Sequence, residues 1–434
     1  MKKLFIDTLG CQMNKSDTER IIGMLSHFDY TVTEDEKDAD LFIINTCAIR
    51  QLSTDKAYSR LGCWGKIKRN NKAKSVKIAI CGCVAQLEKE QLLKKFPQVD
   101  LVFGTRNIYQ LPELLNKIKE TRICATSDEP LTENNYTIKR LPSINAWLPI
   151  MEGCDNFCTY CIVPYTRGKE RSRTIESIVK EARQILSDGY KEITLLGQNV
   201  DSYGKNLNDG TNFAKLLKTL DNLDGKFRIR FTSSYPTDIT DEVIDVVKNS
   251  KNICECFHIP MQSGNNRILK MMNRRYNTKE YSAIVQKIRN NIENVAITSD
   301  FIAGFPSETE EEFKDTLSAI DNLQLDYSNT AAYSPRPITP AAKMVDKFVP
   351  EEKKRERLQI LNEKVKQASL KSNEKYLGKV LEVLIDNVKD GIYQGRTGNN
   401  KVVHLLDNKT FEIGQFLDVK IERVSAWCCF GRSV

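Results

Sequence analysis

Short apolar runs at the start of the chain alternate with stretches of helical periodicity. The runs predict buried strands at Leu4–Asp7, Leu41–Asn45, Val76–Ile80 and Leu101–Phe103. Helical patterns follow at Asp17–Phe28, Leu87–Phe96 and Leu111–Lys119. Alternation of this kind is typical of a parallel sheet with helices on its faces. We therefore expect an N-terminal parallel α/β domain over residues 1–121.

Residues 122–145 lack periodicity and contain Pro130, Asn134, Asn135 and Pro142, which indicates a linker. The alternation then resumes, with strands expected at Trp147–Met151, Glu192–Leu196, Arg228–Thr232, Cys256–Pro260, Ile297–Ile302 and Tyr327–Ala332. Helices are expected at Ile175–Leu186, Phe213–Leu220, Asp241–Lys248, Lys279–Asn290 and Glu310–Leu323. Six strands with helical crossovers favour an open, partial (β/α)6 barrel over residues 146–373, with its active site at the carboxyl ends of the strands.

The last part of the chain has a different pattern. Residues 351–373 form a charged stretch that we interpret as a solvated connecting helix. Over residues 374–434, strands are predicted at Val380–Ile385, Lys401–Leu406 and Leu417–Ile421, with turn glycines at Gly391, Gly398 and Gly414. This spacing favours a small C-terminal β-barrel.

Composition and charge fit a several-domain protein that stays in the cytoplasm. The chain has 434 residues, of which 40% are hydrophobic and 28% charged. The net charge of +8 permits an acidic partner such as RNA without requiring one. No apolar run approaches the roughly 20 residues that cross a bilayer, and Asp7 interrupts the apolar N-terminus too early for a signal peptide. We expect no association with a membrane.

Three of the thirteen cysteines stand close together, at Cys154, Cys158 and Cys161. Cytosolic cysteines rarely form disulfides, so metal or redox chemistry is the better interpretation. Zinc sites usually combine two C-x2-C pairs, and no second pair follows here. Three thiolates on one loop can hold three irons of a [4Fe–4S] cluster and leave the fourth open. That open iron suits S-adenosylmethionine, whose amino and carboxylate groups can chelate it.

Three more cysteines follow the predicted strands of the N-terminal domain. Cys11, Cys47 and Cys83 each come at or just after a strand end. Parallel strands end along one edge of a sheet, where open α/β folds bind ligands. Each thiol alone could be an ordinary buried cysteine, but the repeated placement favours a second three-thiolate cluster. Cys81 is the competing ligand, and we prefer Cys83 because it follows Gly82 at the turn.

These motifs resemble those of the radical S-adenosylmethionine methylthiotransferases along nearly the whole chain. Within that family the chain is most similar to the branch that acts on N6-dimethylallyladenosine in tRNA, because Gln12-Met13-Asn14 follows Cys11. The other matching stretches are Asn45–Arg50, Gly82–Ala85, Gly153–Arg173, Leu196–Val200, Pro260–Gly264 and Asp300–Pro306.

The resemblance implies two [4Fe–4S] clusters, one on Cys154, Cys158 and Cys161 and an auxiliary one on Cys11, Cys47 and Cys83. It implies that one S-adenosylmethionine methylates a sulfur on the auxiliary cluster. A second yields a radical that abstracts hydrogen from C2 of N6-dimethylallyladenosine (isopentenyladenosine), next to the anticodon. An electron donor and a sulfur donor are implied but not identified.

Two other kinds of function remain open from the sequence. One is methylthiolation of another target, either threonylcarbamoyladenosine in tRNA or an aspartate of a ribosomal protein. The other is a non-catalytic iron–sulfur protein that binds RNA.

Several polar residues are candidates for ligand contact. Gln198, Asn199, Gln262 and Ser263 stand at predicted strand ends, where they could contact S-adenosylmethionine or simply shape turns. Basic candidates for the tRNA anticodon loop fall in two groups, Arg167, Lys169, Arg171 and Arg173, and Lys66, Lys68, Arg69, Lys72 and Lys74. The first group could equally form internal salt bridges and the second a solvated helix face.

The C-terminal barrel resembles a TRAM domain, a small RNA-binding module, through Gly395-Arg396-Thr397 and Val419-Lys420-Ile421. The final strand departs from that pattern at Trp427-Cys428-Cys429-Phe430, which we interpret as packing residues.

Overall fold

The computed structural model describes residues 1–49, 51–71, 75–127 and 138–434 and divides into two compact units. The N-terminal unit consists of Met1–Pro142 together with two later segments, Glu152–Asp155 and Cys161–Glu170. The C-terminal unit contains Ser143–Met151, Asn156–Tyr160 and Arg171–Val434. Among the described residues, no helix is long and apolar enough to cross a membrane.

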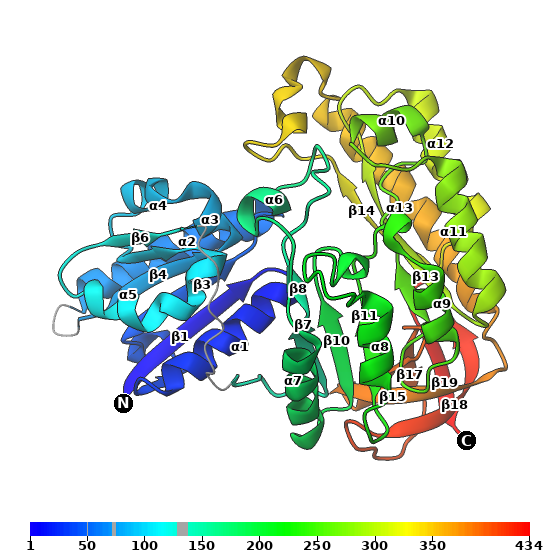
Figure 1. Cartoon of the computed structure of the whole chain (residues 1–434), viewed down its shortest axis with the longest axis horizontal. Coiled ribbons are helices and arrows are strands. Elements are labelled where there is room, and N and C mark those ends of the chain that lie inside the picture. The colour runs from blue at the N-terminus through cyan, green and yellow to red at the C-terminus, as the bar shows by residue number, and fades with distance from the viewer. Residues whose placement is uncertain (50, 72–74, 128–137) are drawn as a thin grey trace. The chain divides into compact units, whose positions relative to one another are not determined.

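The N-terminal unit is built on a six-stranded parallel sheet in the order β2-β1-β3-β4-β5-β6 (Figure 1). Its strands are β1 (Lys2–Leu9), β2 (Tyr30–Val32), β3 (Leu41–Thr46), β4 (Lys77–Gly82), β5 (Leu101–Phe103) and β6 (Ile123–Ala125). Its helices are α1 (Gln12–Ser26), α2 (Gln51–Asn70), α3 (Cys83–Glu88), α4 (Glu90–Lys95) and α5 (Leu111–Lys117), with short 3-10 turns η1 (Glu36–Asp38) and η2 (Thr105–Gln110).

Two apolar cores cover the two faces of this sheet. Alternate residues of β3 enter different cores, because side chains alternate along a strand. Phe42 and Ile44 pack with Trp64 of α2, whereas Ile43 packs with Ile21 of α1 and Leu111 of α5. Every residue of β3 is buried, as expected for a central parallel strand covered on both sides. The predicted parallel α/β domain is confirmed.

Some elements of this unit were not predicted. β2 and α2 have no counterpart among the expected strands and helices, and β6 lies within residues 122–145, which we assigned to a linker. β6 is only three residues long and half-buried, so it lacks the apolar run that identifies a strand from sequence. The linker residues Pro130, Asn134 and Asn135 lie outside the described residues.

The C-terminal unit begins with six parallel barrel strands. One sheet has the order β11-β10-β7 and the next has β12-β13-β14, and a bridge between Ile229 and Ile253 joins them. The strands are β7 (Asn145–Pro149), β10 (Glu192–Leu196), β11 (Arg228–Phe231), β12 (Cys256–His258), β13 (Ala296–Ala303) and β14 (Tyr327–Ala332), and a short pair comprises β8 (Met151–Glu152) and β9 (Arg171–Ser172). β7 and β14 are the edges, so the barrel is partial, as predicted.

Helices connect the barrel strands close to the expected positions. They are α7 (Ile175–Ser187), α8 (Phe213–Asp221), α9 (Asp241–Lys248), α10 (Asn266–Met271), α11 (Thr278–Asn291) and α12 (Glu310–Leu323). The short α6 (Val163–Thr166) folds with the N-terminal unit, and α13 (Glu351–Glu374) leads from β14 to the small barrel. The remaining short turns are η3 (Val200–Ser202), η4 (Pro236–Asp238), η5 (Pro340–Lys343) and η6 (Val345–Lys347). In α12, Thr309 and Glu312 form a capping box, and three glutamates occupy the first turn. Both features stabilise a helix N-terminus.

The chain ends in a closed five-stranded barrel in the order β15-β16-β17-β19-β18. Its strands are β15 (Val380–Lys389), β16 (Ile392–Thr397), β17 (Val402–Leu405), β18 (Phe416–Val424) and β19 (Cys429–Ser433). The predicted small barrel is confirmed, although β16 was not expected. Our interpretation of Trp427 as a packing residue is wrong. Cys429 fills the core, whereas Trp427 stands in the turn before β19 and is 54% exposed.

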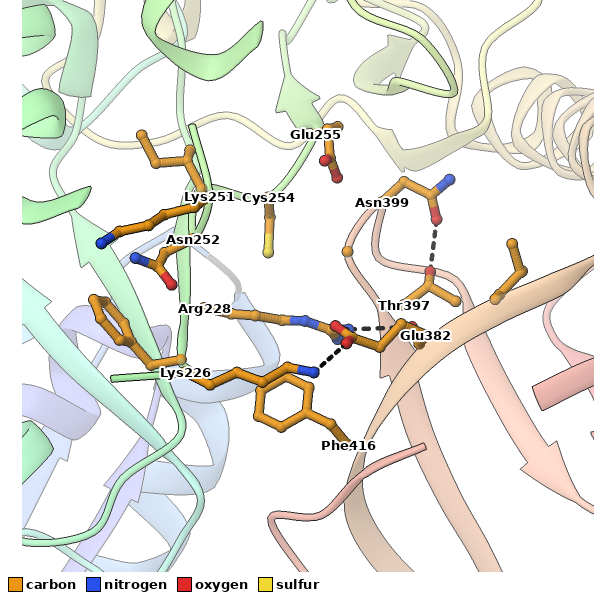
Figure 2. A pocket seen from close by; sticks show the side chains of 14 residues that line it. Lys226, Arg228, Lys251, Asn252, Cys254, Glu255, Glu382, Thr397, Asn399 and Phe416 are labelled. Atoms are coloured by element: carbon orange, nitrogen blue, oxygen red, sulfur yellow. Dashed lines mark hydrogen bonds and ion pairs between the residues drawn. The ribbon is translucent and has the colours of Figure 1, made fainter. Parts of the chain in front are cut away.

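Two buried arginines attach the small barrel to the amino-terminal ends of the larger barrel's strands. Arg230 binds Glu192 at 2.6 Å and donates to the carbonyl oxygens of Thr397 and Gly398 at 2.8 and 2.9 Å. Arg228 spans the same junction, donating to Glu382, as Figure 2 shows. A guanidinium can satisfy several acceptors at once, so each side chain holds two elements together.

We predict that Arg230→Met lowers the free energy of unfolding by about 3–5 kcal/mol, because it leaves the Glu192 carboxylate buried without its partner. Arg432→Met is the matched control. Its ion pair with Glu422 is largely exposed, so the cost should stay below about 1 kcal/mol. Urea unfolding followed by circular dichroism measures both. Equal losses in the two variants would contradict the assignment.

Candidate functional site

The three strand-end cysteines of the N-terminal unit meet at one edge of the sheet. β1, β3 and β4 are neighbours, and their register pairs Leu9 with Thr46 and Thr46 with Gly82. Cys47 and Cys83 therefore follow two paired residues directly, and Cys11 comes two residues after Leu9. The structure brings these three side chains together as the sequence predicts.

The thiols of this group interact with one another. Interaction with the Cys47 thiol lowers the pKa of Cys11, and the same interaction raises the pKa of Cys47. Burial raises the pKa of Cys83, and the positive charge of Arg167 opposes that rise. Iron binds thiolates rather than thiols, so these three side chains would have to lose their protons before they could hold an iron cluster.

Two buried asparagines connect the three cysteine-bearing turns. Asn14 accepts from the Cys11 backbone N–H at 3.3 Å and donates to Asn45 Oδ1 at 2.9 Å and to the Thr46 carbonyl at 3.3 Å. Asn45 donates in return to the Asn14 carbonyl at 2.9 Å. Its Oδ1 lies only 2.6 Å from where a Cβ on Gly82 would stand, and Gly82 has φ +87°. A side chain at that position would push the third turn away from the other two.

Arg167 is the buried cation beside these cysteines. It is 3% exposed and binds Asp17 at 2.6 Å, with Glu152 at 3.7 Å. Its backbone is fixed as well, because Arg106 donates to the Arg167 carbonyl at 2.9 Å. Of the two roles open for Arg167, the internal salt bridge is the one the structure shows. A fixed positive charge here favours a group of thiolates.

Cys81, the competing ligand, lies inside β4. It is fully buried in the core that contains Ile43 and Phe103. Burial raises its pKa well above the usual value. Cys83 is also buried, but it begins α3 at the sheet edge directly after the end of β4, which supports our preference for it.

Among the described residues, no three His, Cys, Asp or Glu side chains are gathered closely enough to hold one metal ion. Three thiols beside the positive charge of Arg167 are the donor chemistry that a [4Fe–4S] group would need, because that group is anionic when bound by thiolates.

Cys154, Cys158 and Cys161 lie on one short loop, so the chain itself keeps them near one another. Within the N-terminal unit, the Cys154 N–H donates to the Gly168 carbonyl at 3.0 Å. Within the C-terminal unit, Cys158 is 8% exposed and its Sγ lies 3.5 Å from Nη1 of Arg274.

Arg274 is a site residue that sequence reasoning missed. Its guanidinium is 9% exposed, donates to the Tyr276 hydroxyl at 2.7 Å, and lies over the Tyr235 ring at 4.4 Å. A buried cation beside a cysteine sulfur stabilises negative charge on that sulfur and on anything it binds. No motif marks this position, because only the folding of the segment after α10 brings it to Cys158.

The same segment also fixes the backbone of the cysteine loop. Thr159 donates from its N–H to the Met272 carbonyl at 3.0 Å and from its hydroxyl to the Met271 carbonyl at 2.8 Å. Asn273 donates to the Phe157 carbonyl at 3.1 Å. Phe157 itself has a positive φ of 47° and is 47% exposed.

The four residues predicted to contact S-adenosylmethionine fall into two pairs at strand ends. Gln198 and Asn199 follow β10, and Asn199 donates to Asp238 at 2.6 Å while its buried Oδ1 accepts nothing from any described residue. Gln262 and Ser263 follow β12, where Gln262 has φ +75° and pairs with β13. The Ser263 hydroxyl is fully buried and accepts from Asn265 N–H, which is a turn contact.

Two further polar groups lie beside Asn199 and were not predicted. The carboxylate of Asp201 and the hydroxyl of Ser234 are both buried and lie close enough to interact, because hydrogen bonding from Ser234 partly opposes the effect of burial on the Asp201 pKa. Burial raises the pKa of Asp201 to about 7.

The other basic candidates are divided between internal and exposed positions. Arg173 binds Glu181 at 2.7 Å and Lys68 binds Asp100 at 2.6 Å, so both form ion pairs within the protein. Lys169, Lys66 and Arg69 are exposed, and Arg171 is partly exposed. Lys72 and Lys74 lie outside the described residues.

Family models match the chain in three consecutive regions. The model described as uncharacterized protein family UPF0004 matches residues 3–104, the radical SAM superfamily matches 148–320, and the TRAM domain matches 374–434. A tRNA-2-methylthio-N(6)-dimethylallyladenosine synthase from Acetivibrio thermocellus is 44% identical over the whole of this chain and 91% of its own length. The chain belongs to the tRNA-2-methylthio-N(6)-dimethylallyladenosine synthase family.

A second relative is similarly close in sequence, and two solved structures share the fold. The synthase from Thermotoga petrophila is 43% identical, over all of this chain and 97% of its own. The radical S-adenosylmethionine methyltransferase TsrM from Kitasatospora setae has a TM-score of 0.59 at 12% identity, covering 79% of this chain and 75% of that one. OxsB, a cobalamin-dependent radical enzyme, has a TM-score of 0.52 at 13% identity, covering 83% and 56%. These two share the fold alone.

We predict that Asn14→Ala reduces the iron retained per chain after anaerobic reconstitution, and lowers the free energy of unfolding by about 2–3 kcal/mol. The change leaves the Cys11 N–H and Asn45 Oδ1 without their partners. Asn107→Ala is the matched control, because Asn107 is buried in the same unit but binds Gln110 and Ser127 instead. Equal iron loss in the two variants would show that the Asn14 network has no special relation to the cysteines.

Asp201 should make stability depend on pH. Its folded pKa of about 7 lies above the unfolded value of about 3.9, so the folded state binds the extra proton. Stability should therefore fall as pH rises from about 4 to 7, by at most about 4 kcal/mol, and then level off. Asp201→Asn should flatten that decline. Thermal unfolding at several pH values measures this, and an unchanged slope in Asp201→Asn would contradict it.

Proposed function

We propose that this protein inserts a methylthio group at C2 of N6-dimethylallyladenosine, next to the anticodon of tRNA. It is a radical S-adenosylmethionine enzyme whose substrate is tRNA and which uses a [4Fe–4S] cluster and S-adenosylmethionine. The observation that carries the proposal is the pair of cysteine sets, one on a loop and one on three adjacent strand ends, in a chain related over its full length to the named synthases.

Cys154, Cys158 and Cys161 would hold the radical cluster. When bound, that group supplies the electron that cleaves the sulfonium C–S bond of S-adenosylmethionine and yields an adenosyl radical. Arg274 would place a fixed positive charge at the Cys158 sulfur. Asn199, Asp201 and Ser234 would offer polar groups to the amino acid or ribose groups of the cosubstrate, and Gln198 and Gln262 stand after β10 and β12. Ser263 would shape its turn.

Cys11, Cys47 and Cys83 would hold a second, auxiliary cluster, which supplies the sulfur to be inserted. Arg167 would balance part of its negative charge, and the Asn14–Asn45 contact would keep the three turns at the correct spacing. An aromatic C2–H is neither acidic nor easily displaced, so radical chemistry is the physically suitable route. We also propose a cytoplasmic location, because that is where tRNA is modified and used.

Iron and sulfide analysis tests the number of clusters. Two [4Fe–4S] groups give about eight irons per chain after anaerobic reconstitution. About four irons would remove the auxiliary cluster from the proposal.

Variants of single cysteines test which cysteine set serves cleavage of S-adenosylmethionine and which serves methylthiolation. Cys154→Ala should abolish cleavage of S-adenosylmethionine and keep the auxiliary cluster. Cys83→Ala should keep cleavage and abolish methylthiolation, because the sulfur source is lost while the radical is still made. Cys63→Ala, which changes an exposed thiol, is the matched control and should keep both activities. Methylthiolation by Cys83→Ala would refute the auxiliary set and make Cys81 the next ligand to test.

Nucleoside analysis of tRNA from a deletion strain tests the substrate. Loss of methylthiolated dimethylallyladenosine supports the proposal. Loss of a methylthiolated threonylcarbamoyladenosine, or no change in any tRNA base, would overturn it.

A further inference from the structure

A pocket of about 380 Å³ lies in the C-terminal unit, where the small barrel meets the first residues of β13 and β14. Thr298 and Tyr327 line it from the strands, and Arg396, Asn399 and Trp427 line it from the small barrel. All of these residues belong to the C-terminal unit. Arg228 and Arg230 hold the larger and the smaller barrel of that unit together. The pocket is large enough for a planar ligand of the size of a nucleobase.

Two aromatic side chains form an exposed pair at this pocket. Trp427 is 54% exposed and Tyr327 is 42% exposed, with ring centroids 5.9 Å apart at an edge-to-face angle of 82°. Single exposed apolar residues are common, but a tryptophan and a tyrosine exposed together beside a pocket indicate a binding surface. Flat aromatic rings are the usual platform for unstacked bases.

A buried acceptor in the same wall lacks a donor. Asn373 is 3% exposed and donates to the carbonyls of Ser425 and Ala426 at 2.8 and 3.3 Å. Its Oδ1 accepts no hydrogen bond from the described residues. A buried acceptor without a donor lowers the stability of the fold by about 1–3 kcal/mol. A ligand with an N–H donor on its edge, as nucleobases have, would satisfy it.

The charges at the pocket disfavour recognition through phosphate alone. Lys401 binds Asp326 at 3.1 Å, and Arg396 binds Asp386 at 3.2 Å. Each cation is thus partly balanced by a carboxylate. Stacking and hydrogen bonding therefore remain the main sources of affinity, which points to a base.

The neighbouring pocket in Figure 2 lacks these properties. There the face of Phe416 is already covered, by Lys226 at 4.6 Å and Arg228 at 5.2 Å. Both cations also form ion pairs with Glu382. We interpret that pocket as part of the junction between the barrels.

We propose that the pocket between Tyr327 and Trp427 binds one unpaired base of the tRNA substrate, other than the base that is modified. This inference rests on the proposed function. Tyr327 begins β14, and Ala332 at the carboxyl end of that strand lies about 17 Å away, at roughly 3.3 Å per residue. Since catalysis belongs to the carboxyl ends, the base held here comes from a different nucleotide of the same single-stranded region.

The test uses the reconstituted full-length protein and a labelled RNA hairpin with the anticodon-loop sequence. Trp427→Ala should raise the Kd and the KM for RNA about tenfold through loss of one stacking partner, with kcat unchanged. Cleavage of S-adenosylmethionine without RNA should also stay unchanged. Trp427→Phe should restore affinity, because it keeps a flat ring. Phe28→Ala, which removes an aromatic ring that is 42% exposed and lies outside the pocket, is the matched control.

Tryptophan fluorescence supplies a readout that a purely structural role would not move. RNA should quench the wild-type protein more than Trp427→Phe, which retains only the fully buried Trp64 and the partly buried Trp147. Unchanged RNA affinity in Trp427→Ala would overturn the inference, and so would equal quenching by adenosine monophosphate, which would indicate a site for free nucleotides. If the wild-type protein binds and is quenched by RNA but methylthiolates none, the proposed function fails and this site stands.

Discussion

The site in the N-terminal unit depends on the parallel register of three neighbouring strands. No single segment of the chain could present Cys11, Cys47 and Cys83 together, because they are separated by helices α1 and α2 and the strands that follow. Pairing of β1 with β3 and of β3 with β4 aligns the strand ends, and so aligns the thiols. Hydrogen bonds between Asn14 and Asn45 then hold together the turns that follow β1 and β3. Formation of the sheet and formation of the ligand set are thus one event, and a shift in register would separate the thiols.

Buried arginines are the second feature that organises the molecule. Arg167 lies beside the strand-end cysteines, Arg274 beside Cys158, and Arg230 at the junction with the small barrel. Each is buried and bonded to carboxylates, carbonyls or a thiol. Arg167 and Arg230 are balanced by buried carboxylates that the net charge of +8 already counts, so their burial leaves the charge of the surface nearly unchanged.

The sequence predicted those features that depend on local pattern. The cysteines follow apolar runs, and the runs are strands, so the edge on which Cys47 and Cys83 lie could be deduced before any coordinates. Arg274 and Asp201 could not be found in this way, because distant segments bring them to the site. Trp427 was misassigned for a related reason. Its hydrophobic character suggests packing, but the turn before β19 holds it away from the core, which Cys429 fills instead.

The cysteine loop has a further consequence through the way its flanks are divided. Residues 152–155 and 161–170 fold with the N-terminal unit, whereas 156–160 fold with the C-terminal unit. Ile162 completes one core of the first unit, and Arg167 stands beside its cysteines. The N-terminal unit is therefore not encoded by one continuous stretch of the gene. Recombination that exchanged only residues 1–142 between relatives would combine a new sheet with a foreign Ile162 and Arg167. Substitutions in residues 1–142 must therefore remain compatible with the residues on both sides of the cysteine loop, which fold with them.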